Sequence, residues 1–363
     1  MLHVIESSAS EARAYASTTF RWAGSAILDA CTVEAAGGHL MVLTADGCLH
    51  LVNLTDHTST LLCSVGLPEI QPDADGSLFG APMHRLHASF DGAYVAIVVD
   101  RGRQGIVVET QTGVTTMHLD GGDYYEETVP FSACFLRLER RDVFVHRSAW
   151  NRLDAFDPAT GKLLTERYIA PYEAAGDRPD HYLDYFHGQL LGSPEGGLLF
   201  DDGWVWHPVS IPRIWSVAAW LMSNPWESED GASVVDLGMR DDWSQPACWI
   251  DEQHIAVWGA TTWDDEASEE SKHGPGLRIF GLSEAKLVTH DWWPMPNLEN
   301  AVALFSDAKR LYGAAANGTA VWDISSRELL AEYPGFVARF LDRTRSTLLA
   351  LNGDEIHELA LPW

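Results

Sequence analysis

The chain has 363 residues, 46% of them hydrophobic, and a formal net charge of −28 at pH 7. This length and apolar content are sufficient for a large buried core, while the negative charge opposes binding to nucleic acid or to anionic membranes. The same charge favours cationic partners, although plain solubility accounts for it equally well.

The N-terminal sequence MLHVIESSASEARAYAS has neither the basic region nor the apolar stretch of a secretory signal. No apolar run approaches the roughly 18 residues that a membrane-spanning helix needs. An odd number of cysteines without C-x-x-C spacing favours free thiols, mostly buried, in a reducing compartment; they are Cys31, Cys48, Cys63, Cys134 and Cys248. We therefore expect a cytoplasmic protein.

In chain order, the first predicted strand lies at His3–Glu6 or Thr18–Gly24, ahead of any complete repeat. Asp46-Gly47 then joins two alternating strands, because both residues of an Asp-Gly turn tolerate a positive φ. Apolar strands and short turns follow one another in the same order in three further stretches: His87–Leu119, Cys134–Tyr168 and Ala301–Tyr333. We interpret each stretch as a four-stranded antiparallel unit.

Three other stretches are less regular: His181–Ala219, Ala247–His290 and Val337–Leu359. The last of them supplies only three strands before the sequence ends. An N-terminal strand paired with this unit would complete it, close the molecule into a ring and remove an open sheet edge.

Trp322-Asp323 ends a predicted third strand, and Phe156-Asp157 occupies the equivalent place in another unit. With the four-strand plan over about residues 25–360, these pairs resemble the WD-repeat β-propellers at the level of fold. The resemblance implies an all-β chain: a single closed seven-bladed β-propeller of four-stranded antiparallel blades, the last completed by an N-terminal strand. Third strands are then expected near residues 50, 106, 153, 204, 278, 320 and 356.

We expect residues 1–363 to form a single propeller domain with acidic insertions at about 221–244 and 260–276. Strands of a blade run alternately up and down, so inter-blade connections share one face with the hairpins between second and third strands. We place the long segments on that face: Leu67–Pro82, Asp120–Thr128, Ala170–Asp180, Leu221–Ser244 and Ala260–Gly276.

Residues Glu227 to Glu270 include thirteen acidic side chains and one basic side chain, a net charge of −12. Aromatic rings flank these acidic runs, which suits a basic protein surface because rings supply contact area and carboxylates pair with Arg or Lys. Solvated loops without any partner account for the pattern equally well. The predicted partner-binding residues are Trp226, Glu227, Glu229, Asp230, Asp241, Asp242, Trp243, Trp263, Asp264, Asp265, Glu266, Tyr124, Tyr125, Glu126 and Glu127.

Sequence motifs for phosphate binding, for a nucleophilic serine and for metal binding are missing, so we expect no cofactor, no metal and no catalytic residue. Asp73-Ala-Asp75-Gly76 begins like a calcium loop but lacks a closing Glu. His84 and His87 precede or begin a strand, which favours structural roles. Carboxylates near Tyr182, Tyr185 and His187 are the best candidates for acid–base chemistry; they are Asp180, Asp184, Asp201 and Asp202, although Asp201-Asp202-Gly203 is more simply a hairpin turn.

The chain has 15 tryptophans, and we expect most of them to fill the gaps between blades. The leading hypothesis is a non-enzymatic interaction protein that binds a basic protein partner, for example a neutraliser of a cationic toxin, as immunity proteins are. The alternative is a carbohydrate-binding or hydrolytic propeller with a small-molecule site at the mouth of the central channel.

Overall fold

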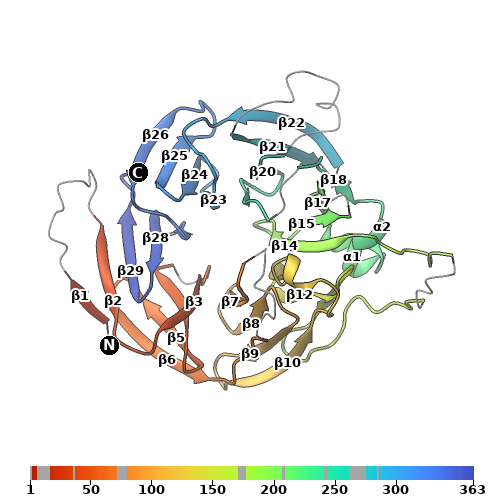
Figure 1. Ribbon diagram of the computed structural model, residues 1–363, viewed down its shortest axis with the longest axis horizontal. Coiled ribbons are helices and arrows are strands. Elements are labelled where there is room, and N and C mark those ends of the chain that lie inside the picture. Colours follow the sequence, from red (N-terminus) through yellow and green to blue (C-terminus); the bar gives the residue numbers. More distant parts are fainter. Residues whose placement is uncertain are drawn as a thin grey trace.

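Seven antiparallel sheets stand around a central axis, each with its first strand innermost (Figure 1). The computed structural model describes residues 2–5, 17–35, 37–71, 80–170, 177–206, 209–240, 244–260, 275–283 and 286–363. We number the sheets as blades 1 to 7 in chain order, beginning after the N-terminal strands. This arrangement is the predicted seven-bladed propeller.

Four blades have four regular strands each. They are blade 1, with β3 (Ile27–Thr32), β4 (His39–Thr44), β5 (Cys48–Asn53) and β6 (Thr58–Ser64), and blade 2, with β7 (Met83–Ala88), β8 (Tyr94–Asp100), β9 (Gln104–Glu109) and β10 (Val114–Asp120). Blade 5 has β19 (Ala247–Trp249), β20 (His254–Trp258), β21 (Gly276–Ser283) and β22 (Lys286–Pro294), and blade 6 has β23 (Ala303–Ser306), β24 (Arg310–Ala315), β25 (Gly318–Asp323) and β26 (Leu329–Pro334).

The other three blades depart from this plan. Blade 3 has three regular strands, β11 (Ala133–Leu138), β12 (Arg141–Ala149) and β13 (Arg152–Phe156), preceded by the 3-10 turn η1 (Glu126–Thr128). Blade 4 has β14 (Phe186–Gly192), β15 (Leu198–Val205), β16 (Val209–Ser210), β17 (Arg213–Ser216) and β18 (Val235–Asp236), with helices α1 (Val217–Met222) and α2 (Glu227–Asp230). Blade 7 has β27 (Phe340–Asp342), β28 (Thr347–Asn352), β29 (Glu355–Ala360), β2 (Thr18–Trp22) and β1 (Leu2–Ile5).

Each pair of neighbouring blades shares an apolar core cluster, and the clusters form a ring. Strand β20 shows how the sequence produces it, because successive side chains of a strand point to opposite faces. Ile255 and Val257 pack in the cluster shared with blade 4, whereas Ala256 and Trp258 pack in the cluster shared with blade 6. Both faces of the strand are therefore buried, which explains its continuous apolar sequence.

The ring is closed by N-terminal strand β2, which pairs antiparallel with β29 of the last blade. Phe20 lies opposite Ile356 in this ladder and is 1% exposed, within the core cluster that joins blade 7 to blade 1. Strand β1 then pairs with β2 at the outer edge. The predicted closure is confirmed, and both of the N-terminal segments considered for it are strands.

The two Asp residues of the WD-like pairs close the turn after a third strand. Asp323 Oδ1 accepts hydrogen bonds from Ser325 Oγ at 2.7 Å and from the Ser326 amide at 2.8 Å. Asp157 Oδ1 likewise accepts from the amides of Ala159 at 3.0 Å and Thr160 at 3.1 Å. A carboxylate that accepts from amides two or three residues onward stabilises a tight turn, so this position favours Asp.

Third strands lie where they are predicted in six of the seven blades. The exception is the strand expected near residue 204, because Trp204 belongs to the second strand of blade 4, β15. The interpretation of Asp201-Asp202-Gly203 as a hairpin is also wrong, since all three residues lie inside this buried strand. A Cβ at Gly203 would lie 2.2 Å from the Tyr185 ring, so close packing rather than a turn requires this glycine.

Most tryptophans in the described ranges fill gaps between blades, as predicted. Eight are 7% exposed or less: Trp22, Trp204, Trp215, Trp220, Trp249, Trp258, Trp293 and Trp322. All five cysteines are free, and burial raises the pKa of the Cys134 thiol and the Cys248 thiol, the latter to about 12.

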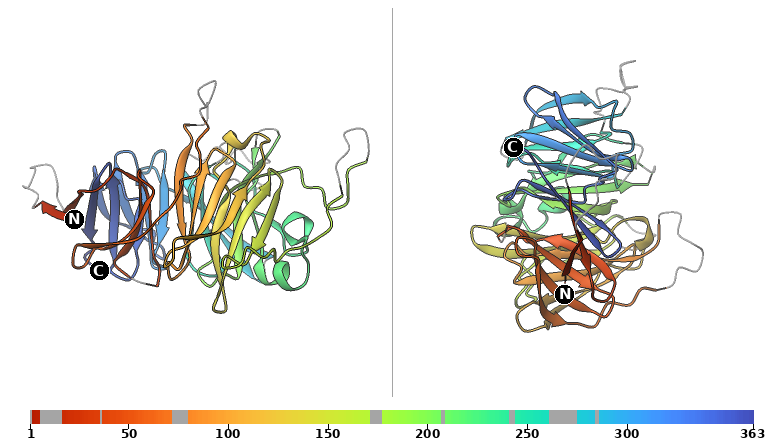
Figure 2. Two further views of the ribbon diagram at one scale, coloured as in Figure 1. Left: turned by 90° about the horizontal axis from the view of Figure 1, so that it is seen from below. Right: turned by 90° about the vertical axis from the view of Figure 1, so that its left-hand side faces the viewer.

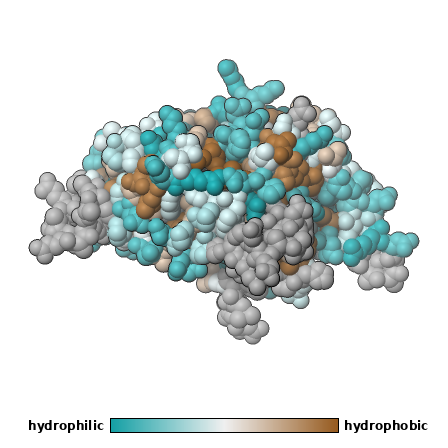
Figure 3. All heavy atoms as spheres, turned by 90° about the horizontal axis from the view of Figure 1, so that it is seen from above, coloured by the Kyte–Doolittle hydropathy of each residue, from teal (hydrophilic) through white to brown (hydrophobic). Residues whose placement is uncertain are grey.

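Single apolar side chains are exposed on the outermost strands, including Val288 of β22 and Leu329 and Leu330 of β26. Figure 3, which views the ring from the side of these strands, shows separate apolar patches within a largely hydrophilic surface. Scattered exposed side chains of this kind are normal in soluble proteins.

Ring closure predicts a large cost for removing Phe20. Phe20→Ala should lower the free energy of unfolding by about 3 to 5 kcal/mol, because it leaves a cavity between the first and last blades. Urea denaturation measures this change, with Arg21→Ala as the matched control, since Arg21 on the same strand has a 60% exposed side chain. Equal stability of the two variants would contradict closure by β2.

A second prediction concerns His146, which is 4% exposed and stacks among Phe131, Phe144 and Phe156. Burial lowers the pKa of His146 from 6.5 to about 4. Between these values the unfolded chain binds a proton that the folded chain does not, so stability falls with falling pH, by about 3 kcal/mol in total.

The variant His146→Phe should remove this component of acid destabilisation. The difference in unfolding free energy between variant and wild type should therefore grow in the variant's favour between neutral pH and pH 4. Denaturation at both pH values measures it, and exposed His118, changed to Gln, serves as the control. An identical pH dependence in all three proteins would refute the prediction.

Candidate functional site

The fourth segment of blade 3 leaves its sheet early. Leu164 donates its amide to the Ala155 carbonyl at 2.8 Å, but from Thr165 onward side chains replace the ladder. The Thr165 hydroxyl accepts from the Ala155 amide at 3.2 Å, and the Arg167 guanidinium donates to the Leu153 carbonyl at 3.1 Å. The edge of β13 is thereby satisfied without a fourth strand, and helix α2 of blade 4 packs against it.

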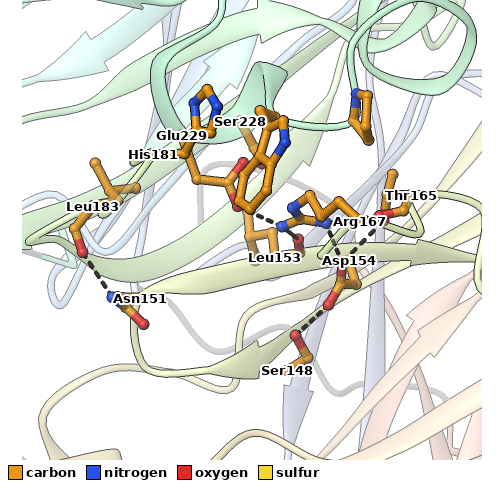
Figure 4. A network of polar contacts seen from close by, with 12 residues as sticks. Ser148, Asn151, Leu153, Asp154, Thr165, Arg167, His181, Leu183, Ser228 and Glu229 are labelled. Atoms are coloured by element: carbon orange, nitrogen blue, oxygen red, sulfur yellow. Dashed lines mark hydrogen bonds and ion pairs between the residues drawn. The ribbon is translucent and has the colours of Figure 1, made fainter. Parts of the chain in front are cut away.

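Arg167 joins the two blades through a buried polar network (Figure 4). Its side chain is 2% exposed and is paired with Asp154 at 2.5 Å and with Glu229 of α2. Asp154 also accepts hydrogen bonds from the hydroxyls of Ser148 at 2.5 Å and Thr165 at 3.0 Å. Two carboxylates therefore neutralise one buried guanidinium and hold α2 at the edge of blade 3.

Trp226 immediately precedes helix α2, and its ring contacts Arg167 and His181. The Arg167 guanidinium lies 5.0 Å from the centre of its ring, and the His181 ring stacks on it at 4.4 Å. His181 Nδ1 lies 2.8 Å from an Asp230 carboxylate oxygen. These contacts hold His181 in the left-handed region at φ 61°, which is uncommon for residues other than glycine.

A pocket of about 250 Å³ opens between blades 3 and 4 beside α2. Helix α2 itself lies at the outer edge of the ring (Figures 1 and 2). The pocket combines three aromatic walls with charged groups. Its lining comprises Trp150, Asn151, Arg152, Ile169, Ala170, Pro179, Asp180, His181, Tyr182, Leu183, Trp226 and Glu229.

Next to this pocket, three exposed rings and one half-buried ring form a surface that we call the aromatic patch: Tyr124, Tyr125 and Trp206, with the half-buried Trp150. Tyr124 and Tyr125 are each 44% exposed and Trp206 is 46% exposed. Tyr125 meets Trp206 edge-on at 5.2 Å, and Tyr124 lies 5.1 Å from Trp150, which also lines the pocket. Patch and pocket are therefore continuous.

Buried rings support the patch from below. Phe186 stacks on Trp204 at 4.3 Å, and both are 2% exposed or less. Phe186 also contacts Trp150 at 4.6 Å and Trp206 at 5.6 Å. The exposed rings thus rest on a packed base that limits their motion.

The connection before blade 3 adds carboxylates at the rim of the patch. Asp123 is exposed, with a single ion pair to Arg103 at 3.3 Å, and Glu126 and Glu127 are half-buried in η1. Tyr125 precedes that turn at φ 51°, a left-handed conformation.

The structure separates the predicted partner-binding residues into three groups. Tyr124, Tyr125, Glu126, Glu127, Trp226 and Asp230 lie at the patch or around the pocket. Glu227 and Glu229 are buried, 3% and 6% exposed, so the expectation that they face a partner is wrong. The remaining predicted residues lie outside the described ranges: Asp241, Asp242, Trp243, Trp263, Asp264, Asp265 and Glu266.

Burial of Glu227 has a structural cause. Its carboxylate accepts hydrogen bonds from the Ser233 amide at 2.7 Å, the Ser233 hydroxyl at 2.6 Å and the Asn224 amide group at 3.0 Å. It thereby closes the loop that follows α2. An acidic residue in this segment can therefore stabilise a buried loop and need not contribute to the surface charge.

The assignment of Leu221–Ser244 as an inter-blade connection also needs correction. Most of it, from the end of β17 through α1 and α2 to β18, joins the third strand of blade 4 to its fourth. Both helices lie at the outer edge of the ring (Figures 1 and 2). Only the part after β18 leads to blade 5, so the argument from strand direction does not place the acidic segment as a whole on one face.

The carboxylates considered for catalysis do not converge. Asp201 is fully buried and lies 2.6 Å from His187 Nδ1, and Asp202 is paired with buried Arg240. Burial raises the pKa of Asp202 to about 6, against the opposing effect of Arg240. Asp184 pairs with Arg178 at 3.1 Å, and among these four only Asp180 lines the pocket.

Several residues of the site were not predicted: Trp150, Arg152, Arg167, His181 and Trp206. Trp206 departs from the general expectation that tryptophans fill gaps between blades, because it follows the end of β15 at Val205 and is exposed. An Arg in a short polar segment after a strand gives no signal of its own, since one of the two carboxylates that pair with Arg167, Glu229, comes from another blade.

The described ranges contain no group of three His, Cys, Asp or Glu side chains suited to a metal ion. The segment Asp73–Gly76 lies outside these ranges. His84 Nε2 lies 2.9 Å from the Pro68 carbonyl, a structural contact. Helices that could cross a membrane are likewise not found in the described part of the chain.

Comparison with known proteins identifies the fold. No protein-family model and no curated protein matches the chain. The Myceliophteria thermophila Cps50 (Swd1) β-propeller domain is similar at 12% identity and a TM-score of 0.57, over 94% of this chain and 99% of that chain. The RRP9 WD40 repeats are similar at 12% identity and a TM-score of 0.55, over 95% of this chain and 97% of that chain.

Hydrazine synthase of Kuenenia stuttgartiensis is similar as well, at 13% identity and a TM-score of 0.57, over 93% of this chain and 96% of that chain. The chain therefore has a WD40-like β-propeller fold. Identities this low show the fold alone, and function must be argued from the site.

The buried network predicts that Arg167 is essential to the local structure. Arg167→Met should lower the free energy of unfolding by about 3 to 5 kcal/mol, because Asp154 and Glu229 would be left buried without their cation. Arg178→Met is the matched control: its exposed pair with Asp184 should contribute less than about 1 kcal/mol. Thermal and urea denaturation distinguish the two, and similar losses would contradict the prediction.

Proposed function

We propose that this protein is a non-enzymatic, cytoplasmic, protein-binding propeller that binds a basic protein partner through the aromatic patch and the acidic groups around it. The observation that carries the proposal is the patch itself: Tyr124, Tyr125 and Trp206 are nearly half exposed on a rigid, buried base. Tyr and Trp rings with little freedom to move contribute strongly to protein interfaces, because little conformational entropy is lost on binding.

Charge supports the choice of a basic partner. The whole chain carries −28, and exposed Asp123, Asp180 and Asp230 lie close to the patch or the pocket. A field of this sign speeds association with cationic surfaces and disfavours nucleic acid and anionic membranes. We include five further acidic residues in the proposed surface on the basis of sequence: Asp241, Asp242, Asp264, Asp265 and Glu266.

One concrete form of the proposal is the neutralisation of a cationic toxin or nuclease, analogous to the action of immunity proteins. Such a partner would present Arg or Lys side chains around an apolar centre. Carboxylates at the rim would then pair with these cations while the rings fill the centre of the interface.

The aromatic patch can be tested by affinity capture from source cells, followed by titration with the captured protein. The triple variant Tyr124→Ala, Tyr125→Ala, Trp206→Ala should weaken binding by about 100-fold or more, since aromatic anchors often contribute 2 kcal/mol or more each. The control removes apolar side chains elsewhere that are more exposed than those of the patch: Leu61→Ala, Val114→Ala and Val288→Ala. Equal capture by both variants would refute the proposal.

The acidic component has a separate signature in binding kinetics. Charge reversal at Asp241, Asp242, Asp264, Asp265 and Glu266 should slow association and flatten its dependence on salt, with a smaller effect on dissociation. The control reverses five exposed glutamates distant in sequence: Glu34, Glu69, Glu195, Glu328 and Glu332. Stopped-flow or surface-binding kinetics at several salt concentrations measure both, and unchanged association in the first variant would exclude a basic partner.

A further inference from the structure

Two guanidiniums lie close together at the edge of blade 3 but differ in their partners. Arg167 donates hydrogen bonds to two carboxylates and two carbonyls. Arg152, the first residue of β13, is half-buried and lines the pocket. Its guanidinium donates no hydrogen bond to any residue in the described ranges. Arg167 is thus paired with two carboxylates, whereas the Arg152 guanidinium has no hydrogen-bond partner among the residues that the structure describes.

Nearby carboxylates do not compensate Arg152 directly. Asp154 is engaged with Arg167, Ser148 and Thr165, and Glu229 is engaged with Arg167 and Ser228. Burial therefore dominates at Arg152 and lowers the pKa of its guanidinium, although Asp154 and Glu229 act in the opposite direction. A partly desolvated charge that has no hydrogen-bond partner among the described residues is costly, so it calls for an explanation, and a bound anion is one.

The hairpin that carries Arg152 is also held in place. Asn151 donates its side-chain amide to the Leu183 carbonyl at 2.8 Å, which ties the hairpin to the opposite wall of the pocket (Figure 4). His181 on that wall is fixed by Asp230 and Trp226. The walls are therefore positioned before any ligand arrives.

We infer that this pocket binds a small organic carboxylate carried on a flat ring, with the Arg152 guanidinium as the donor to the carboxylate. The aromatic walls, Trp150, Tyr182 and Trp226, suit a ring, and a guanidinium matches a carboxylate with two parallel hydrogen bonds. The volume of about 250 Å³ suits a small molecule. This site adjoins the protein-binding surface proposed above and shares Trp150 with it.

The charges of the pocket favour this ligand over two others. Asp180 and Glu229 also line it, so a dianionic phosphate would be repelled more strongly than a singly charged carboxylate. A lysine or arginine side chain would be repelled by the Arg152 guanidinium, because both carry positive charge.

Fluorine NMR of the full-length protein tests the inference with 4-fluorobenzoate as the probe. The carboxylate should bind at least about 10-fold more tightly than the isosteric 4-fluorobenzamide, since a charge-assisted hydrogen bond is worth roughly 1.5 to 3 kcal/mol. This comparison needs no variant. Equal binding of acid and amide, or no binding of the acid at about 10 mM, would overturn the inference.

Arg152→Gln should lose about 10-fold or more in affinity for 4-fluorobenzoate, and Arg152→Lys should keep part of it. Arg178→Gln, which changes an exposed arginine on the neighbouring connection, should bind as the wild type does. Unchanged affinity in Arg152→Gln would refute the role of this residue, and tighter binding of 4-fluorophenyl phosphate would refute the choice of a carboxylate.

Discussion

Every blade of this ring is apolar on both faces, and those faces are buried only when each blade has a neighbour on either side. The alternation in β20 shows the constraint, since Ile255 and Val257 serve one interface while Ala256 and Trp258 serve the next. A chain that stopped at three strands in its last blade would leave an open edge and an incomplete interface. Strand β2, with Phe20 opposite Ile356, supplies both the missing ladder and the missing core.

The same requirement explains why the site lies where it does. Blade 3 ends in three regular strands, so its outer edge must be satisfied by other means. Thr165 and Arg167 make the hydrogen bonds that a fourth strand would make. Arg167 also forms an ion pair with Glu229 of the next blade. Helix α2 packs against this irregular edge, and the pocket opens beside it.

The acidic residues of this chain have two different roles, which net charge does not distinguish. Asp154, Asp202, Glu227 and Glu229 are buried and matched by guanidiniums, hydroxyls or amides, so they contribute to structure. Asp123 and Asp230 remain exposed near aromatic rings. Exposed carboxylates such as these can act on an approaching partner, so local geometry is more informative than the total charge of −28.

The sequence by itself determined the repeat, the hairpins and the ring closure, because turns such as Asp46-Gly47 and alternating strands depend on residues adjacent in the chain. It also placed the Asp residues that close the third turns. Only the tertiary structure decided that Asp201 to Gly203 lie inside a strand and that Glu227 is buried. The meeting of Trp150, Arg152, His181 and Trp226 was likewise decided there. Trp150 and Arg152 belong to the hairpin between β12 and β13, whereas His181 precedes blade 4 and Trp226 precedes α2. Packing between these segments leaves no periodic signal in the sequence.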